Sequence, residues 1–454
     1  MIDPKIIKEN HESVKEMLSN RNMDFPLDIL FNADRQRRDL IVELQRVKHQ
    51  KNILSMEIAT KKKRNEDAST KISEMGKIGT EIKRLEEESK RNEELFSEYI
   101  GILPNFFHET VPLGKDENDN KIAREYKGRP KLLKKPTKEE EEEEEEEIEK
   151  PGVGIRTDEY PPGIFQMKNH IDLANGLGLI DLERAGKISG SRFYVLKNEM
   201  VKLSMALSNF AIDYLIKEGY TVVQPPYMIR KEAMEGAVIL SDFEETIYKI
   251  ENEDLYMIGT SEHPLASMHM HEILDGKNLP IRYGGISTCF RKEAGAHGKD
   301  MKGLFRVHQF DKVEQFVFCK PEDSWKEHER LLQITEKFYE TLEIPFRTII
   351  LCSGDLGKVS AKTYDIEAWF PAQNSYREIC SCSNCTDYQA RSLKIRYRNN
   401  PNDETSLVHT LNSTLVAIQR TLVAILENYQ TSKGTIIVPQ ALRKYIGDVD
   451  EIGK

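Results

Sequence analysis

The sequence has few of the features that would place a protein in a membrane or outside the cell. No apolar run approaches the roughly 20 residues that a membrane-spanning helix needs, and the opening stretch MIDPKIIKENHESVKEML is charged throughout. The 6 cysteines lack the paired spacing of a disulfide framework. We therefore expect a cytoplasmic protein in a reducing compartment, with no secretory leader and no membrane partner.

The usual glycine-rich loops that hold nucleotide phosphates are also absent. The sequence contains neither GxxxxGK[ST] nor GxGxxG. If the protein uses a nucleotide, arginines and a metal ion must hold the phosphates instead. No Ser-His-Asp or Cys-His signature indicates a covalent nucleophile either.

The net charge of −10 would argue against a nucleic-acid partner, but it is unevenly distributed along the 454 residues. An uninterrupted run of glutamates occupies residues 139–147, and without it the chain is close to neutral. Basic residues cluster elsewhere, as in Lys61–Arg64. Such a local cluster can attract phosphates whatever the total charge.

Residues 27–100 have the pattern of two long helices. Apolar residues recur at alternating spacings of four and three, first over 40–58 and again over 75–99. The segment KKKRNEDAST between them lacks this seam and contains turn formers. The pattern predicts an antiparallel helical hairpin that projects from a larger body. It fits either a dimerisation coil or an RNA-binding arm, and the basic tip Lys61–Arg64 favours the arm.

The remaining chain changes character twice. We expect an N-terminal domain over 1–110 that carries the helical arm, a linker with an acidic insertion over 111–162, and a globular domain over 163–454. In the last of these, strands are predicted within 221–229, 255–260, 281–291, 303–319, 346–352, 363–383 and 435–439, and helices over 322–342 and 411–429. Short loops between strands favour an α+β fold with a largely antiparallel sheet.

The stretch REICSCSNC holds Cys380, Cys382 and Cys385. The last two form a C-x-x-C pair that could bind zinc, but a structural site needs about four ligands and no second Cys or His pair has matching spacing. His263, His269 and His271 could also suggest a metal, although an ordinary helix after the GTSEHPLA stretch accounts for them.

Two further stretches carry arginines suited to phosphates. In TCFRKEAG a predicted strand ends at Arg291, and Glu293 would share its sheet face if the strand continued. In LNSTLVAIQRTLVAILENYQ, the residues Asn412, Thr414 and Arg420 lie near the start of the predicted helix. Surface ion pairing is the simpler role for each arginine.

Several stretches, in the right order, resemble the seryl-tRNA synthetase family of class II aminoacyl-tRNA synthetases. FRKEAGAHGKDMKGLFRVHQFDKVE is similar to motif 2, GYTVVQPPYM to motif 1, and LNSTLVAIQRTLVAILENYQ to motif 3. GTSEHPLA matches the family's serine-binding loop, and TYDIEAWFPAQNSYREICSCSNCTDYQAR a further block. Motif 3 often has glycines before its arginine, whereas this sequence has Leu415 and Gln419 there. Bulkier residues at these two places also resemble archaeal and eukaryotic-type relatives.

The resemblance implies a class II antiparallel sheet, an N-terminal two-helix arm and a homodimer with Pro226 in its interface. It also implies that the domain over 1–110 binds tRNA and that the domain over 163–454 is catalytic. It implies ATP-dependent attachment of L-serine to tRNA(Ser), and also to tRNA(Sec), with Mg²⁺ as cofactor. The residues implied to bind serine are Thr260, Glu262, Glu314, Asn412 and Thr414. Those implied to bind ATP are Arg291, Glu293, Val307, Phe310, Glu378, Ser381 and Arg420. Of these, Glu378 and Ser381 are also implied to hold Mg²⁺. The residues implied to be catalytic are Arg291, Glu378 and Arg420.

Within this family the cysteines of REICSCSNC are expected to pack in a strand and turn. No zinc is expected, because the TSE loop resembles the ordinary form of the family, which recognises serine without zinc. Two alternatives differ from an active ligase of serine and tRNA. A ligase that charges a carrier protein would lack the long arm, and an inactive RNA-binding scaffold would have lost Arg291, Glu378 or Arg420.

Overall fold

The structure, a computed structural model, describes residues 1–128, 167–293 and 302–453. Its contacts divide the chain into two compact units, Met1–Pro104 and Asn105–Lys454. The acidic run 139–147 and the part of the expected linker from 129 to 162 lie outside the described residues.

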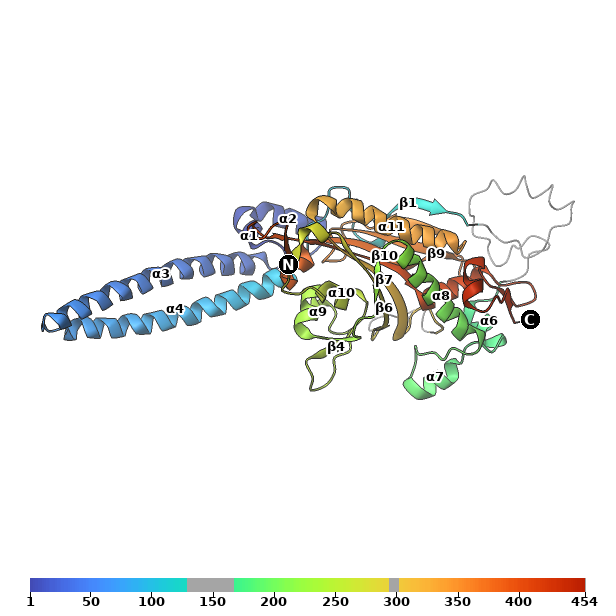
Figure 1. Ribbon diagram of the computed structural model, residues 1–454, viewed down its shortest axis with the longest axis horizontal. Helices are drawn as coiled ribbons and strands as arrows, with labels where there is room; N and C mark the ends of the chain where they lie inside the picture. The colour runs from blue at the N-terminus through green and yellow to red at the C-terminus, as the bar shows by residue number, and fades with distance from the viewer. Residues whose placement is uncertain (129–166, 294–301, 454) are drawn as a thin grey trace. The chain divides into compact units, whose positions relative to one another are not determined.

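The first unit is helical. Its elements are α1 (Pro4–Glu9), α2 (His11–Asn20), α3 (Leu27–Lys63) and α4 (Ser69–Ile102). The helices α3 and α4 lie side by side as the predicted hairpin (Figure 1). Val47 of α3 and Ile82 and Leu85 of α4 are buried between them, with Leu40, Leu44 and Ile78 packed alongside. The predicted seam is therefore confirmed.

The second unit is built on an eight-stranded sheet in the described residues, with strand order β1-β8-β9-β10-β13-β7-β6-β2. Its strands are β1 (Lys121–Tyr126), β2 (Thr221–Val223), β6 (Ile281–Phe290), β7 (Gln309–Cys319), β8 (Phe346–Ile350), β9 (Lys362–Phe370), β10 (Ser375–Thr386) and β13 (His409–Ala417). All neighbours are antiparallel except β2 and β6, which are parallel. The predicted α+β fold is confirmed.

Helices and small strand groups surround this sheet. The helices are α6 (His170–Gly176), α7 (Leu182–Ser189), α8 (Glu199–Lys217), α9 (Lys231–Ala237), α10 (Glu262–Ser267), α11 (Ser324–Thr341), α12 (Tyr388–Leu393) and α13 (Ile418–Asn428). The small strand groups are β3 (Met228–Arg230) with β4 (Leu255–Met257), β5 (Ile273–Asp275) with β11 (Arg396–Arg398) and β12 (Ser406–Leu407), and β14 (Ile436–Ile437) with β15 (Glu451–Ile452). In the part of the chain that the structure describes, no helix has the length and apolar character to cross a membrane.

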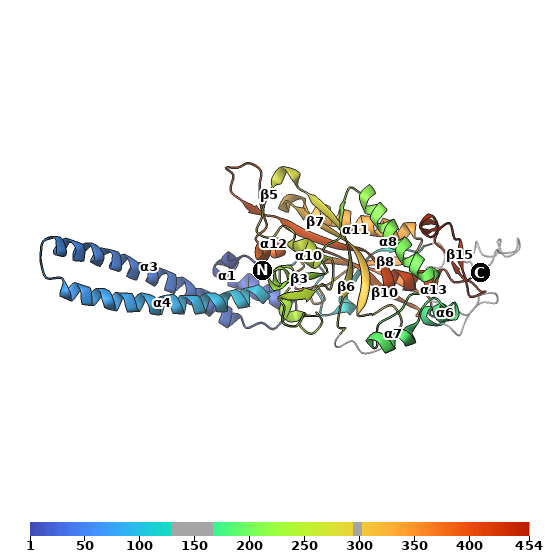
Figure 2. The same cartoon turned by 60° about the horizontal axis from the view of Figure 1, so that its bottom comes forward.

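The two faces of the sheet have different roles. One face packs against α8 and α11, which lie beside each other in Figures 1 and 2 and whose Phe210 and Phe338 rings stack with centroids 4.9 Å apart. Val313 and Val317 of β7 belong to this main core, whereas Phe316 of the same strand belongs to a second core with residues of α10 and α12. Alternation along each strand therefore assigns every second side chain to the face away from α8 and α11.

Several sequence predictions differ from the structure. The strand expected over 221–229 is split into β2 and β3, which belong to different sheets, and the strand expected over 303–319 begins only at Gln309. The helix expected over 411–429 begins only at Ile418, because 409–417 is a central strand between β10 and β7. Both faces of that strand are buried, so it lacks the polar alternation that marks a half-exposed strand. The single strand expected over 363–383 is the hairpin β9–β10, and residues 121–126 of the expected linker form the edge strand β1.

Candidate active site

Segments far apart in the sequence bring polar side chains together on the face away from α11. Lys312 Nζ donates to Thr260 Oγ1 at 2.6 Å and to Thr414 Oγ1 at 3.4 Å, and it forms an ion pair with Glu314. Thr414 Oγ1 donates to Glu314 Oε2 at 3.3 Å. All four residues are buried. Together with Glu262 they are called the polar pocket below.

Glu262 is the first residue of α10 and adds a second carboxylate to the polar pocket. Its backbone N–H donates to Thr260 Oγ1 at 3.2 Å, and its Oε1 accepts from Gln389 Nε2 at 2.8 Å. Burial and the neighbouring charge of Glu314 raise the pKa of Glu262 to about 7, and Lys312 partly opposes the shift. Burial also raises the pKa of Glu314. The pocket is therefore built to pair with a cation.

Arg291 lies at the end of β6, beside the polar pocket. Its Nε donates to Gly259 O at 3.0 Å, and its guanidinium carbon is 5.3 Å from the centroid of the Phe310 ring. Its charge opposes the rise in the pKa of Glu262 and Glu314 and adds to the lowering of the pKa of Glu378. Arg291 is thus close enough to influence both the polar pocket and the group around Glu378.

Arg420 and Glu378 form the second charged group. Arg420 Nη1 donates to Glu378 O at 2.9 Å and lies 3.2 Å from Glu378 Oε2. The Arg420 guanidinium holds the pKa of Glu378 below its usual range, while 48% of the Glu378 side chain stays exposed. This carboxylate is therefore ionised and accessible, which suits a hard cation such as Mg²⁺.

Ser381 lies on β10 directly opposite Asp365 of β9. Asp365 is half-buried, and its buried Oδ1 has no hydrogen-bond partner in the described structure. Burial and the charge of Glu378 raise the pKa of Asp365, and a hydrogen bond with Ser381 partly opposes this. The side-chain oxygens of Glu378, Ser381 and Asp365 thus all belong to the paired strands β9 and β10.

Comparison with known proteins identifies the family. Residues 1–107 match the family model for the seryl-tRNA synthetase N-terminal domain, and residues 245–429 match that for the class II tRNA synthetase core domain (G, H, P, S and T). A serine–tRNA ligase of Nitrosopumilus maritimus is 51% identical, covering 100% of both chains. One from Cenarchaeum symbiosum is 48% identical over 98% of this chain and 99% of its own. This chain belongs to the seryl-tRNA synthetase family.

Solved structures of seryl-tRNA synthetases have the same fold. The Pyrococcus horikoshii enzyme, complexed with ATP, matches with a TM-score of 0.87 at 45% identity, over 100% of this chain and 99% of that one. The cytoplasmic serine–tRNA ligase of Naegleria fowleri, in complex with AMP, matches with a TM-score of 0.82 at 36% identity, over 100% and 98%. The predicted resemblance to archaeal and eukaryotic-type members of the family is confirmed.

Sequence reasoning missed one residue of the polar pocket, Lys312, and one neighbour of it, Gln389. Lys312 and Gln389 both contact residues implied to bind serine. Lys312 precedes Glu314 by two residues on a predicted strand, so their shared face could have been inferred. Gln389 lies on the short helix α12, and no local pattern indicates that it reaches Glu262.

Three other predicted site residues, Glu293, Val307 and Asn412, are not members of the polar pocket. Glu293 was expected to share the sheet face of Arg291 if the strand continued that far. The strand does not, because β6 ends at Phe290 and Glu293 has φ +51°. The Glu293 side chain pairs with Arg306 at 3.0 Å. Val307 is buried. Asn412 shares the face of Thr414 on β13, but its Nδ2 donates to Cys385 Sγ at 3.8 Å.

The cysteines of REICSCSNC are all buried and free. Cys380 and Cys382 lie in the main core, where their thiols contact Tyr339 OH at 3.4 Å and His328 O at 3.8 Å. Burial raises the pKa of both thiols. The intervening Ser381 lies on the other face, beside Asp365. The expected strand packing is confirmed for Cys380 and Cys382.

The three histidines considered as metal ligands have separate partners. His263 is buried, and burial lowers its pKa to about 3, while its Nδ1 accepts from Gly259 N at 3.4 Å. His269 contacts Glu272 and Tyr283, and His271 contacts Glu232. Only His263 lies within α10, and His269 and His271 follow its end.

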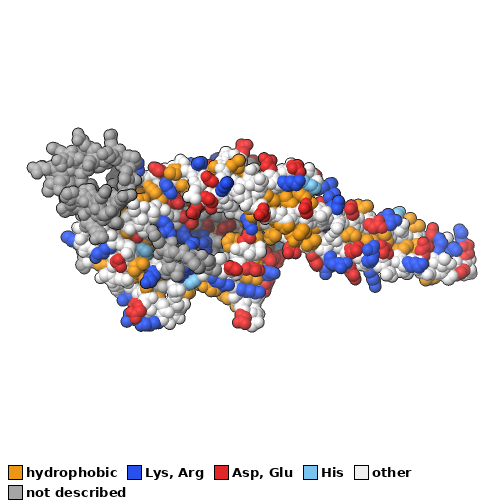
Figure 3. Space-filling view, turned by 180° about the vertical axis from the view of Figure 1, so that it is seen from behind, with side chains coloured by type: hydrophobic (Ala, Val, Ile, Leu, Met, Phe, Trp, Pro, Cys, Tyr) orange, Lys and Arg blue, Asp and Glu red, His pale blue; other side chains and the backbone are white. Residues whose placement is uncertain are grey.

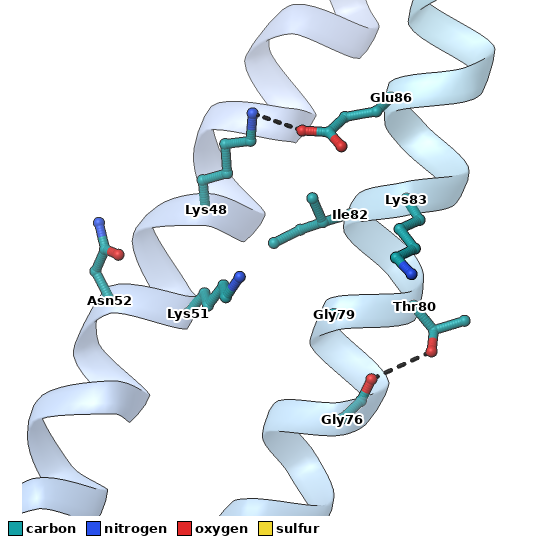
Figure 4. Close-up of a pocket in the computed structure, with 9 residues that line it drawn as sticks. All are labelled: Lys48, Lys51, Asn52, Gly76, Gly79, Thr80, Ile82, Lys83 and Glu86. Atoms are coloured by element: carbon teal, nitrogen blue, oxygen red, sulfur yellow. Dashed lines mark hydrogen bonds and ion pairs between the residues drawn. The ribbon is translucent and has the colours of Figure 1, made fainter.

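On the arm, the basic tip Lys61–Arg64 lies at the end of α3. Lys61 Nζ donates to Asp67 O at 3.1 Å, and Lys62, Lys63 and Arg64 are exposed. Farther along the hairpin, a groove of about 670 Å³ lies between α3 and α4 where α4 contains Gly76 and Gly79 (Figure 4). Lys48 pairs there with Glu86 at 2.8 Å. Figure 3 shows both acidic and basic side chains along the visible face of the hairpin.

Proposed function

We propose that this chain is a serine–tRNA ligase that activates L-serine with ATP and transfers it to the 3′ end of tRNA(Ser), and by family resemblance to that of tRNA(Sec). The observation that carries the proposal is that two sites lie next to each other. One is the buried polar pocket, with its two carboxylates and two threonine hydroxyls. The other holds Arg291, Arg420 and the ionised carboxylate of Glu378. An amino acid and a nucleotide need these two kinds of site side by side.

In the first step, a carboxylate oxygen of serine attacks the α-phosphate of ATP. A new oxygen–phosphorus bond forms, the bond to the β-phosphate oxygen breaks, and pyrophosphate leaves. Arg291 would neutralise charge on the α-phosphate and Arg420 charge on the departing pyrophosphate. Because both reactants are anions, holding them in line is the main contribution, and such positioning can supply roughly 7–11 kcal/mol.

The ATP site is proposed to use two groups of residues besides the arginines, one for adenine and one for Mg²⁺. Phe310, beneath the Arg291 guanidinium, offers a ring for stacking on adenine, with Glu293 and the backbone at Val307 meeting its edge. Glu378 and Ser381 would hold Mg²⁺, which supplies positive charge to the phosphates when bound. The accessible, ionised carboxylate of Glu378 and the hydroxyl of Ser381 are hard oxygen ligands of the kind Mg²⁺ prefers.

Serine recognition is assigned to the polar pocket. The carboxylates of Glu262 and Glu314, with Thr260, would hold the ammonium group, and Thr414, with Asn412 nearby, would meet the hydroxyl. Alanine would leave those buried polar groups unpaired, a rejection that can reach about 10⁴-fold. In the second step a ribose hydroxyl of the tRNA attacks the seryl-adenylate carbonyl, and AMP leaves.

The arm is proposed to contact the tRNA backbone through Lys61–Arg64, since phosphate contacts need charge and no base-reading motif. The N-terminal domain is placed at 1–110 and the catalytic domain at 163–454. We propose a cytoplasmic location, as expected for an enzyme that charges cytoplasmic tRNA. No zinc is assigned to Cys380, Cys382 or Cys385.

A homodimer is proposed through the outer face of α8. Val201, Met205 and Ile216 are spaced to lie on one side of this helix, and their side chains are 38%, 63% and 56% exposed. An exposed apolar stripe on a long helix suits a second copy of the chain. Pro226, exposed in the connection between β2 and β3, is assigned to the same interface.

The test is serine-dependent exchange of label between pyrophosphate and ATP, using purified protein with Mg²⁺. Exchange with serine, followed by charging of tRNA(Ser), is the expected result. Exchange without charging of any tRNA would favour a carrier-protein ligase. Absence of exchange with every amino acid would favour an inactive RNA-binding scaffold.

A further inference from the structure

Lys312 is a buried lysine at the centre of the polar pocket, and the reaction described above does not use it. Its ammonium contacts Thr260 Oγ1, Thr414 Oγ1 and the Glu314 carboxylate. These are three of the residues proposed to bind serine, and they come from the loop before α10, from β13 and from β7. An ammonium group has three donors, so one side chain ties all three segments together.

The contacts also fix the direction of a hydroxyl group. Thr260 Oγ1 accepts from Lys312 Nζ at 2.6 Å and from Glu262 N at 3.2 Å. A hydroxyl oxygen has two acceptor positions and one hydrogen. Both acceptor positions are therefore occupied, and the Thr260 hydrogen remains as a donor whose direction Lys312 has set.

The charges of the polar pocket favour the same role. With both carboxylates ionised, Glu262 and Glu314 carry two negative charges, and Lys312 cancels one of them. One negative charge then remains, which matches the single ammonium of an amino acid. Two uncompensated buried carboxylates would instead favour uptake of a proton.

We propose that Lys312 is a positioning residue for amino-acid recognition, which holds Thr260, Glu314 and Thr414 in register and leaves the polar pocket with one negative charge before serine enters. This inference rests on the proposed function, since it assigns serine to that pocket. It predicts that Lys312 governs the KM for serine and leaves the KM for ATP largely alone.

The test is pyrophosphate exchange by the full chain carrying K312M, with the KM for serine and for ATP measured separately. The matched control is K362M. Lys362 is a half-buried lysine on β9 of the same sheet, where it packs over the Tyr364 ring at 4.7 Å. We expect K312M to raise the KM for serine at least 30-fold and to change that for ATP less than 3-fold, while K362M changes neither by more than 3-fold.

The pH profile gives a second readout. The groups that influence Glu262 are Glu314 and Lys312 of β7, Gln389 of α12 and Arg291. Lys312 lowers the pKa of both carboxyls, so K312M should move the acidic limb of kcat/KM for serine to higher pH by at least one unit. A lysine that only supported packing would not move this limb.

K312R keeps the inference falsifiable if K312M fails to fold. A planar guanidinium retains the charge but cannot replace a compact ammonium between two hydroxyls and a carboxylate. We expect K312R to raise the KM for serine at least 10-fold. A folded K312R or K312M with a KM for serine within 2-fold of the unaltered protein, or with equal increases for serine and ATP, would overturn the inference. Failure of the unaltered protein to exchange with serine would instead overturn the proposed function.

Discussion

Glu314 of β7 and Thr414 of β13 lie directly opposite each other on neighbouring strands, and the Thr414 hydroxyl donates to the Glu314 carboxylate at 3.3 Å. The two residues are 100 positions apart in the sequence. Antiparallel pairing therefore places the carboxylate that we propose for the serine ammonium beside the hydroxyl that we propose for the serine hydroxyl. A small amino acid with a polar side chain needs these two contacts within a few ångströms of each other.

Thr414→Val should weaken discrimination between serine and alanine. Valine keeps the shape of threonine and removes the hydroxyl, so serine loses a hydrogen bond while alanine loses none. We expect the ratio of kcat/KM for serine over alanine, measured by pyrophosphate exchange, to fall about 100-fold. Thr410→Val on the same strand, where Thr410 bonds to Gln389, serves as the control. An unchanged ratio in T414V would refute the role of Thr414.

Activity toward serine should fall as the pH drops through about 7. The pKa of Glu262 is raised to about 7, so below that pH its carboxyl carries a proton and cannot pair with the serine ammonium. We expect kcat/KM for serine to fall about 10-fold per pH unit on the acidic side. E262Q should have low activity and lack this limb. A limb retained unchanged in E262Q would assign the titration to another group.

Glu378→Gln should impair activation and weaken Mg²⁺ use. The substitution removes the negative charge that pairs with Arg420 and faces the proposed metal site, so we expect exchange to fall about 10²–10³-fold. The Mg²⁺ concentration for half-maximal exchange should rise as well. Glu367→Gln is the matched control, because Glu367 lies opposite Glu378 on β9 and pairs with Arg347 instead. Equal losses in both variants would argue for a general effect on the hairpin.

Replacing Lys61, Lys62, Lys63 and Arg64 with alanine should weaken tRNA charging and leave serine-dependent exchange intact. Each lost phosphate contact lowers the salt dependence of tRNA binding, because fewer counterions are released. We expect a higher KM for tRNA and a shallower slope of log KM against log salt concentration. If the slope stays as steep as in the unaltered protein, the tip does not contact phosphates.

Chelation of zinc should leave serine-dependent exchange unchanged. Cys380 and Cys382 are buried in the main core with raised thiol pKa values, so these thiols should also react slowly with a thiol reagent until the protein is unfolded. The measurement compares exchange and thiol labelling before and after chelator treatment. Loss of exchange that added zinc restores would return the cysteines to consideration as ligands.

Much of this protein could be predicted from local sequence. The arm followed from a repeating apolar seam, because a helix in contact with one partner buries one stripe. Arg291, Glu378 and Arg420 were proposed from stretches that resemble family motifs, because such motifs record the residue types that phosphate chemistry requires.

Only the tertiary structure decided which side chains meet. Residues 411–417 read as the start of a helix because a strand buried on both faces has no polar alternation, and the neighbours β10 and β7 supply the hydrogen bonds that make it a strand. Lys312 lies in the stretch that is similar to motif 2 but received no role from it, because its contacts depend on the convergence of the loop before α10, β7 and β13. The sequence by itself determined the residue types and the local elements, since these depend on short-range periodicity and on chemistry. The polar pocket depends on long-range strand pairing, which brings together groups that no local pattern connects.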